Sequence, residues 1–183
     1  MTRVIGGVAG GRRLRVPPGV RTRPTSDRAR EGLFSTLESL LGTLDGIRFA
    51  DLYAGSGAVG LEALSRGAVH ALLVESDVRA AAVLHDNVRS LGVTGAQVRQ
   101  ESVARVIAEP PPAAYDVVFL DPPYADPVDA VLAAVATNGW LRPGGVLAVE
   151  RASRDPEPAW PAGVEGLRSR RYGEGTLWYG RRS

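Results

Sequence analysis

Four consecutive residues, Asp121-Pro122-Pro123-Tyr124, combine a carboxylate, a rigid backbone and an aromatic ring at the end of an apolar run. An exocyclic amine on a nucleobase is a poor nucleophile, because its lone pair is delocalised into the ring. The Asp121 carboxylate and the Pro122 carbonyl can both accept its N–H groups and so orient the amine toward an activated methyl group. The Tyr124 ring can stack on the base. A structural Asp-Pro-Pro turn with a packing tyrosine is the simpler alternative.

A glycine-rich turn upstream predicts a cofactor site and favours the chemical interpretation of that motif. Gly55, Gly57 and Gly60 follow an apolar strand-like run with the spacing of a dinucleotide-binding turn, in which a helix start offers free N–H groups. Glu75 closes the next run, where a carboxylate can accept hydrogen bonds from ribose hydroxyls. This local pattern alone is compatible with NAD, FAD or S-adenosylmethionine.

Two details favour S-adenosylmethionine. Asp51 lies just before the glycines, where its carboxylate can meet a cationic ammonium group but would repel a pyrophosphate. Ser102 ends the third strand-like run and can reach an adenine edge, although it is equally suited to cap a helix. The expected cofactor-binding residues are Asp51, Tyr53, Gly55, Ser56, Gly57, Glu75, Ser76, Ser102 and Asp121. The expected catalytic residues are Asp121, Pro122 and Tyr124.

The elements that must position these residues alternate between strands and helices. Short β-rich runs lie at 47–53, 70–76, 96–102, 116–123 and 145–151, and helical patterns lie at 57–66, 78–91, 102–109 and 127–138. This alternation predicts a parallel sheet with helices on both faces. Runs at 164–171 and 175–181 predict a terminal antiparallel hairpin. The expected fold is therefore α/β and Rossmann-like, with a seven-stranded, mostly parallel sheet.

The N-terminal region differs from this pattern. Residues 3–23 are broken by Gly and Pro and predict a small β-hairpin arm, and 142–145 predicts a turn into the fifth strand. Thr25 and Ser26 can cap a helix over 27–44. The apolar face of that helix comprises Leu33, Leu37, Leu40, Leu41 and Leu44.

Charge is distributed unevenly along the 183 residues. All 22 basic residues are Arg, and the net charge is only +2. Residues 1–30 nevertheless hold eight Arg and one acid, Asp27, which suggests a polyanionic partner for the arm. A solvated arm whose arginines reflect genomic base composition is an equal alternative.

The remaining composition excludes several classes of protein. There is no Cys, so disulfides, Cys-bound zinc and Cys nucleophiles are excluded, and with two His no metal site is expected. No apolar run approaches the roughly 20 residues that span a bilayer. The N-terminus has no secretory h-region, so the cytoplasm is the expected compartment.

The chain resembles the class I S-adenosylmethionine-dependent methyltransferases with an (Asp/Asn)-Pro-Pro-(Tyr/Phe) motif. It is most similar to the bacterial RsmD family, the 16S ribosomal RNA guanine-N2 methyltransferases. The similarity covers nearly the whole chain, and it is most specific in RVIGGVAGGRRLRVPPGVRTRPTSDRAREGLFSTL, with DLYAGSGAVGLEALSRGA and DPPY as further matches. The resemblance implies methyl transfer to the N2 amine of one guanine in 16S rRNA, within assembled or nearly assembled small subunits.

On the basis of this resemblance, we expect the chain to divide into an RNA-recognising arm over 1–24 and a methyltransferase domain over 25–183. Phosphate contacts are expected from Arg21, Arg23, Arg28 and Arg30, with Thr25 near the cleft, although some of these Arg side chains could pair with acids of the body. The expected partner is 16S rRNA of the small ribosomal subunit. No membrane association is expected, and the enzyme is expected to be a monomer.

Three alternatives remain open at this stage. DPPY is shared with adenine methyltransferases, so N6 methylation of adenine in DNA or RNA keeps the same chemistry. A nicotinamide-dependent dehydrogenase explains the glycines and Glu75, but leaves Asp51 and the basic arm without a purpose. A ribosome assembly factor with a vestigial fold predicts salt-dependent RNA binding without methyl transfer.

Overall fold

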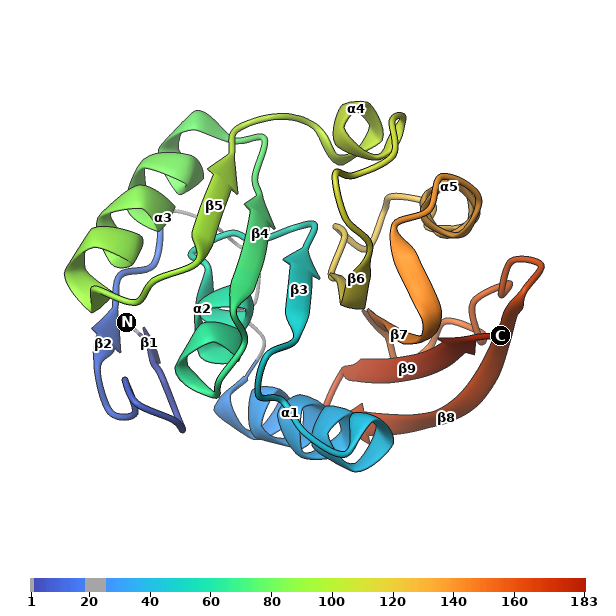
Figure 1. The fold of residues 1–183 in the computed structure, drawn as a ribbon, viewed down its shortest axis with the longest axis horizontal. Coiled ribbons are helices and arrows are strands. Elements are labelled where there is room, and N and C mark those ends of the chain that lie inside the picture. Colours follow the sequence, from blue (N-terminus) through green and yellow to red (C-terminus); the bar gives the residue numbers. More distant parts are fainter. Residues whose placement is uncertain (1, 19–25) are drawn as a thin grey trace.

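The computed structural model describes residues 2–18 and 26–183 and is built around one seven-stranded sheet. Its strands in chain order are β3 (Arg48–Asp51), β4 (His70–Val74), β5 (Ala96–Arg99), β6 (Tyr115–Leu120), β7 (Leu141–Ala152), β8 (Val164–Tyr172) and β9 (Gly175–Arg182). They lie side by side in the order β5-β4-β3-β6-β7-β9-β8 (Figure 1). The first five of that order run parallel, and β9 pairs antiparallel with both β7 and β8. The sheet expected from the sequence is confirmed.

Helices cover both faces of the sheet (Figure 1). One face carries α1 (Asp27–Leu41), α2 (Ala58–Ser65) and α3 (Val78–Leu91), and the other carries α4 (Val103–Ile107) and α5 (Asp129–Thr137). Side chains of consecutive strand residues point to opposite faces of a sheet, so they belong to different apolar cores. Phe49 belongs to the apolar core under α1 to α3, and Ala50 belongs to the core under α4 and α5.

Helix α1 is capped at both ends. The Ser26 side chain accepts a hydrogen bond from the Ala29 N–H, as expected for an N-cap. Gly42 ends the helix with a φ of 83°, a left-handed conformation that glycine adopts at little cost. The helix is therefore shorter than the predicted 27–44, and Leu44 is buried in the connection that follows.

Strand β7 departs most from its predicted bounds. The sequence placed a strand at 145–151 after a turn at 142–145, but the observed strand includes both segments. Its pairing with β6 shifts register between Tyr115 and Val117. Two residues of β6 here stand against five of β7, so three extra residues bulge out without ending the strand, and the local Pro-Gly-Gly sequence was misread as a turn.

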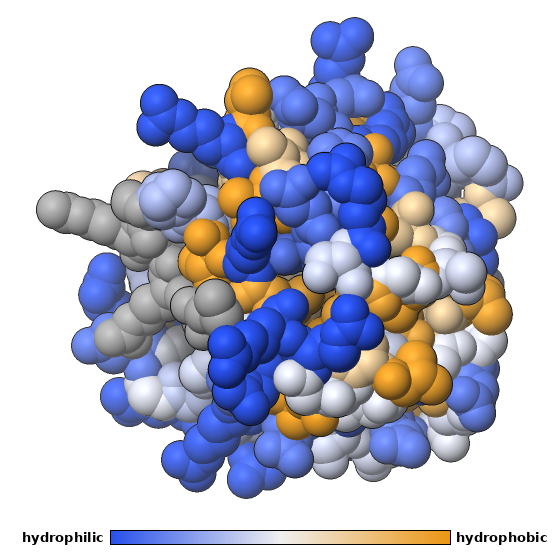
Figure 2. All heavy atoms as spheres, turned by 90° about the vertical axis from the view of Figure 1, so that its left-hand side faces the viewer, coloured by the Kyte–Doolittle hydropathy of each residue, from blue (hydrophilic) through white to orange (hydrophobic). Residues whose placement is uncertain are grey.

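The N-terminal arm is part of the same core as the domain. Strands β1 (Thr2–Arg3) and β2 (Arg13–Leu14) pair antiparallel. Val4 and Leu14 are buried in the core cluster under α1 to α3. The outer surface on this side of the molecule is largely hydrophilic, with apolar side chains showing between the polar ones (Figure 2). The predicted boundary at residue 24 lies outside the described residues.

A buried carboxylate on α2 joins the arm to the domain. Glu62 has no exposed surface, and it accepts hydrogen bonds from the Ile5 and Gly6 N–H groups at 2.8 and 2.9 Å. It also accepts from Arg30 Nε at 3.2 Å and from Arg66 Nε at 2.8 Å. Both carboxylate oxygens are thus doubly occupied, and the charge is compensated by two guanidinium groups.

We expect Glu62→Ala to lower the free energy of unfolding by roughly 3–5 kcal/mol, because the fully buried Arg30 would lose its one fully buried carboxylate partner among the described residues. Urea denaturation followed by far-UV circular dichroism measures the change. The control is Glu38→Ala, which truncates an exposed acid of α1 and is expected to change stability by no more than about 0.5 kcal/mol. Equal stability of the two variants would contradict this role for Glu62.

Candidate active site

The glycine turn between β3 and α2 brings backbone close to three neighbouring elements. Gly57 is the N-cap of α2 with a φ of 88°, and a Cβ there would lie 2.4 Å from Leu84 Cδ1. At Gly60 a Cβ would lie 2.6 Å from Leu73 Cδ2, so the helix can pack against β4 only without a side chain. Gly55, with a φ of 55°, faces open space. The turn therefore leaves its backbone accessible on one side only.

Asp51 lies beneath this turn at the end of β3 and is 1% exposed. Its Oδ2 accepts a hydrogen bond from the Gly60 N–H at 3.0 Å, while Oδ1 is buried with no partner among the described residues. Burial raises the pKa of Asp51 to about 7, with a smaller raising contribution from the charge of Glu75 and against the lowering effect of the Gly60 and Tyr53 N–H groups. A cationic donor placed at Oδ1 would satisfy the oxygen and favour the ionised form.

Glu75 is held at the end of β4 by two backbone groups. Its Oε1 accepts from the Gly55 N–H at 2.9 Å, and its Oε2 accepts from the Asp77 N–H at 2.8 Å. A carboxylate has about four lone-pair positions, so each oxygen retains capacity for a further donor such as a hydroxyl. The hydrogen bond from Gly55 thus joins the glycine turn to Glu75, which the sequence predicted as part of the same cofactor site.

A cavity of about 340 Å³ opens at the carboxyl ends of β3 and β4, where open α/β sheets bind their ligands. Four predicted cofactor residues, Tyr53, Glu75, Ser76 and Ser102, line it. The remaining lining is Leu52, Val74, Val103, Ala104, Asp126, Pro127 and Val131. The mixture of apolar walls with a few polar groups is typical of a small-molecule site. Ser102 also caps α4, accepting from the Arg105 N–H at 3.3 Å, so both interpretations of this residue are compatible with its position.

The other predicted cofactor residues lie around this cavity rather than in its lining. Gly55 is joined to the cavity through its hydrogen bond to Glu75, and Asp51 immediately precedes the lining residues Leu52 and Tyr53. Ser56 is 8% exposed, and its carbonyl accepts from Asn87 on α3. The sequence did not single out Asp126, which is five residues beyond Asp121 and whose only signal was its place in the Tyr-Ala-Asp-Pro continuation of the motif.

The Asp121-Pro122-Pro123-Tyr124 segment follows β6 at the same edge of the sheet. Strand β6 pairs with β3 so that Phe119 lies opposite Asp51, and Asp121 is therefore two residues beyond the level of the buried acid. Asp121 is half-buried and Pro122 is buried, whereas Tyr124 is 40% exposed. An acid, a proline carbonyl and an accessible aromatic ring thus follow β6 at the sheet edge where the cavity opens, a few residues before the lining residues Asp126 and Pro127.

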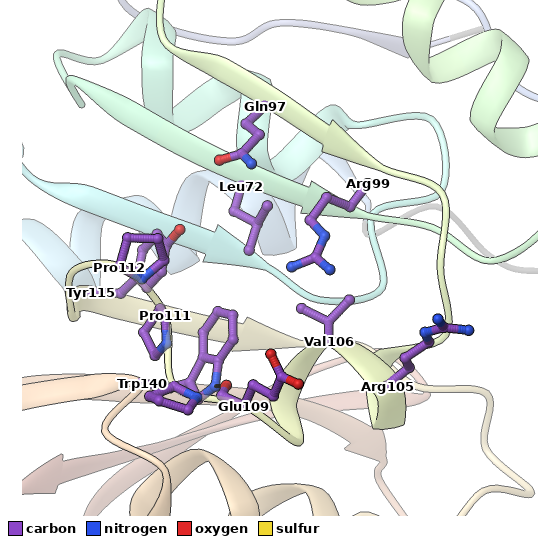
Figure 3. A pocket seen from close by; sticks show the side chains of 11 residues that line it. Leu72, Gln97, Arg99, Arg105, Val106, Glu109, Pro111, Pro112, Tyr115 and Trp140 are labelled. Atoms are coloured by element: carbon purple, nitrogen blue, oxygen red, sulfur yellow. Dashed lines mark hydrogen bonds between the residues drawn. The ribbon is translucent and has the colours of Figure 1, made fainter.

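A second cavity, of about 260 Å³, is lined by Arg105 and Val106 of α4 among other residues (Figure 3). Its wall includes Gln97 and Arg99 of β5 and Trp140 before β7. Arg99 is paired with Glu101, and the Trp140 indole N–H donates to the Glu109 carbonyl. No predicted site residue lies there, so the first cavity is the better candidate.

The predicted RNA-binding residues divide in position. Arg28 is exposed on the first turn of α1, in keeping with a surface role. Arg30 is fully buried, donates to Glu62 and Asp27 and also contacts the Arg3 carbonyl, so the expectation that it binds RNA is corrected. Its place on the inner face of the helix explains the difference. Arg21, Arg23 and Thr25 lie outside the described residues.

Two further features bear on the class of site. Across residues 2–18 and 26–183, no cluster of three or more His, Asp or Glu side chains could hold a metal ion. Within the same part of the chain, no helix has the length and apolar character to cross a membrane.

Known proteins share this architecture over most of the chain. The family model described as "conserved hypothetical protein 95" matches residues 2–181. Ribosomal RNA small subunit methyltransferase D of Escherichia coli K12 is 36% identical over 161 residues, which are 87% of this chain and 79% of that protein. The protein of the same name from Haemophilus influenzae is 34% identical over 158 residues, 84% of this chain and 80% of its own. The solved structure of Escherichia coli yhhF is 33% identical, with a TM-score of 0.88 over 100% of this chain and 98% of that one.

The raised pKa of Asp51 predicts a specific pH dependence of stability. Between its unfolded value of 3.8 and its folded value of about 7, the folded state keeps a proton that the unfolded state has lost. The contribution of Asp51 is therefore complete below about pH 4, declines as the pH rises to about 7 and is constant above. We expect wild type to lose free energy of unfolding relative to Asp51→Asn across this window, measured by denaturant titration at several pH values.

Asp129→Asn, at an exposed position of α5, is the matched control and should follow wild type throughout. A constant difference between wild type and Asp51→Asn from pH 4 to pH 7 would show that the buried carboxyl does not titrate in this range.

Proposed function

This chain belongs to the family described as conserved hypothetical protein 95, the RsmD family, and from that premise we propose that it methylates 16S rRNA of the small ribosomal subunit with S-adenosylmethionine. We assign the acceptor as the exocyclic N2 amine of a guanine. The observation that carries the proposal is the juxtaposition of a cofactor-sized cavity with the Asp121-Pro122-Pro123-Tyr124 segment at one edge of the sheet.

The cofactor assignment rests on the donor set around the cavity. The buried Oδ1 of Asp51 has no hydrogen-bond donor in the described part of the chain, and the ammonium group of S-adenosylmethionine can provide one. Glu75 retains acceptor capacity for ribose hydroxyls, and the apolar walls with Ser102 suit an adenine ring. When bound, S-adenosylmethionine supplies an activated methyl group on a sulfonium.

The chain's own residues orient the acceptor. The Asp121 carboxylate and the Pro122 carbonyl accept the N–H groups of the amine, which directs its lone pair toward the cavity. The exposed Tyr124 ring provides a stacking surface for a base that has been turned out of its RNA stack. Arg28 lies on the surface of α1 as a candidate phosphate contact, and we extend this role to Arg21, Arg23 and Thr25. We propose that the enzyme acts as a monomer.

The test is methyl transfer from labelled S-adenosylmethionine to small subunits isolated from a strain that lacks the endogenous modification, followed by nucleoside analysis. We expect the label in N2-methylguanosine. Label in methyladenosine would retain the fold and the cofactor but overturn the assigned base. Cofactor binding without transfer to any ribosomal substrate would support the assembly-factor alternative.

We expect Asp121→Ala to reduce the methyl-transfer rate at saturating cofactor by at least about 100-fold, since the amine would lose the acceptor that orients it. The dissociation constant of S-adenosylmethionine, measured by calorimetry, should change little. Asp129→Asn again serves as the control. Near-wild-type transfer by Asp121→Ala would remove this residue from the mechanism.

Cofactor affinity should depend on the ionisation of Asp51. The ammonium group binds the carboxylate, and the pKa of this carboxyl is about 7 in the free protein, so binding below that pH must release a proton. We expect affinity to fall toward tenfold per pH unit between about pH 7 and pH 5.5. Calorimetry in buffers of different ionisation enthalpy measures the released proton directly.

In Asp51→Asn, binding should be weaker and proton release should disappear. Proton release that persists in this variant would assign the linkage to another group.

A further inference from the structure

Arg151, the penultimate residue of β7, reaches under the segment that contains the proposed catalytic residues. The residue is 8% exposed. Its Nη2 donates to the Tyr124 carbonyl at 3.1 Å and to the Asp126 carbonyl at 3.1 Å. A single guanidinium nitrogen thus bridges two carbonyls that are separated by one residue, and it does so from a strand that the sheet holds rigid.

The segment between these carbonyls is a tight turn. The Asp126 N–H donates to the Pro123 carbonyl at 2.9 Å, which closes the turn from within. Arg151 fixes the same turn from beneath. Because Tyr124 lies inside this turn, holding its carbonyl also limits where its ring can lie above the cavity mouth.

The two hydrogen bonds of Arg151 also hold a residue in the wall of the proposed cofactor cavity. Asp126 and Pro127 line that cavity together with Tyr53. Burial raises the pKa of Tyr53, the charge of Asp126 raises it further, and the charge of Arg151 lowers it, so both charged groups lie close to this wall. The Arg151 guanidinium therefore contacts both the segment with the proposed catalytic residues and a residue that lines the proposed cofactor cavity.

Arg151 is poorly arranged for a residue whose role is stability. Its Nη1 is buried without a hydrogen-bond partner among the described residues. The carboxylate with which it forms an ion pair, that of Asp155, lies 3.9 Å from Nε. A buried guanidinium with an unsatisfied N–H and such a loose ion pair costs free energy that an apolar side chain of similar length would not.

We propose that Arg151 is a positioning residue for methyl transfer, which holds the 121–126 segment against β7 so that the Pro122 carbonyl and the Tyr124 ring stand in register with the bound cofactor. This inference rests on the proposed function of the same site. It assigns a role to a residue outside both the glycine turn and the Asp-Pro-Pro-Tyr motif.

The decisive variant is Arg151→Met, which keeps the length of the side chain and removes both hydrogen bonds. Single-turnover methyl transfer to small subunits, at saturating S-adenosylmethionine, should fall by about 10- to 100-fold, the effect expected of a misplaced acceptor. Thermal unfolding should occur at the wild-type temperature or above it, because a costly buried charge has been removed. Arg151→Lys, which retains a donor, should recover part of the rate. Arg154→Met, at an exposed position nearby, is the matched control and should keep the wild-type rate.

Wild-type single-turnover kinetics in Arg151→Met, or an equal loss in Arg154→Met, would overturn the inference. A purely structural role would instead lower the unfolding temperature of Arg151→Met and leave its rate at saturation unchanged, which also overturns it.

Amide hydrogen exchange provides a readout that does not depend on activity. We expect the Asp126 N–H and its neighbours in the turn to exchange faster in Arg151→Met, and not in Arg154→Met. If wild type itself transfers no methyl group, the proposed function fails, and exchange alone then decides whether Arg151 holds the segment. Unchanged amide exchange in the turn of Arg151→Met would overturn the inference that Arg151 holds this segment in place.

Discussion

The buried carboxylate of Glu62 is the contact on which the arrangement of this protein depends. It accepts two N–H groups from the arm, one guanidinium N–H from α1 and one from Arg66, and it lies on the helix that begins at the glycine turn. A charge without exposed surface must be fully compensated, so the arm, α1 and α2 can occupy only those relative positions that deliver the four donors. The position of the basic N-terminal region is therefore coupled to the helix that begins at the glycine turn.

Asp51 provides an instructive contrast on the opposite side of the same helix. Both acids are buried, yet Glu62 is saturated with donors, whereas one oxygen of Asp51 has none among the described residues. Burial raises the pKa of Asp51 accordingly. A protein that optimised stability alone would satisfy or remove such a group. A half-satisfied acid beside a cavity is the arrangement expected where a ligand completes the site.

The sequence predicted the sheet, its helices, the terminal hairpin and the family, because long periodic runs and a glycine turn are local signals. It failed where the deciding partner is distant. Arg30 looked like its basic neighbours, and only the packing of α1 onto α2 shows that it faces Glu62. Pro143 and its glycines looked like a turn, but a bulge keeps them in β7. Asp126 and Arg151 carry no motif, since their relation to the cavity arises from the pairing of β6 with β7.

The arginines have a structural role that is separate from the proposed contact with RNA. Arg30 reaches Glu62, Asp27 and a carbonyl of the arm together, and Arg151 bridges two carbonyls of the turn after β6. A guanidinium fork can serve several fixed acceptors at once, whereas the ammonium of lysine is a single point charge on a flexible stem. The number of basic residues therefore overestimates the positive charge that is accessible to a polyanion, because some of the guanidinium groups are buried and paired within the fold. The exposed arginines, such as Arg28, are the ones whose charge an RNA phosphate can still reach.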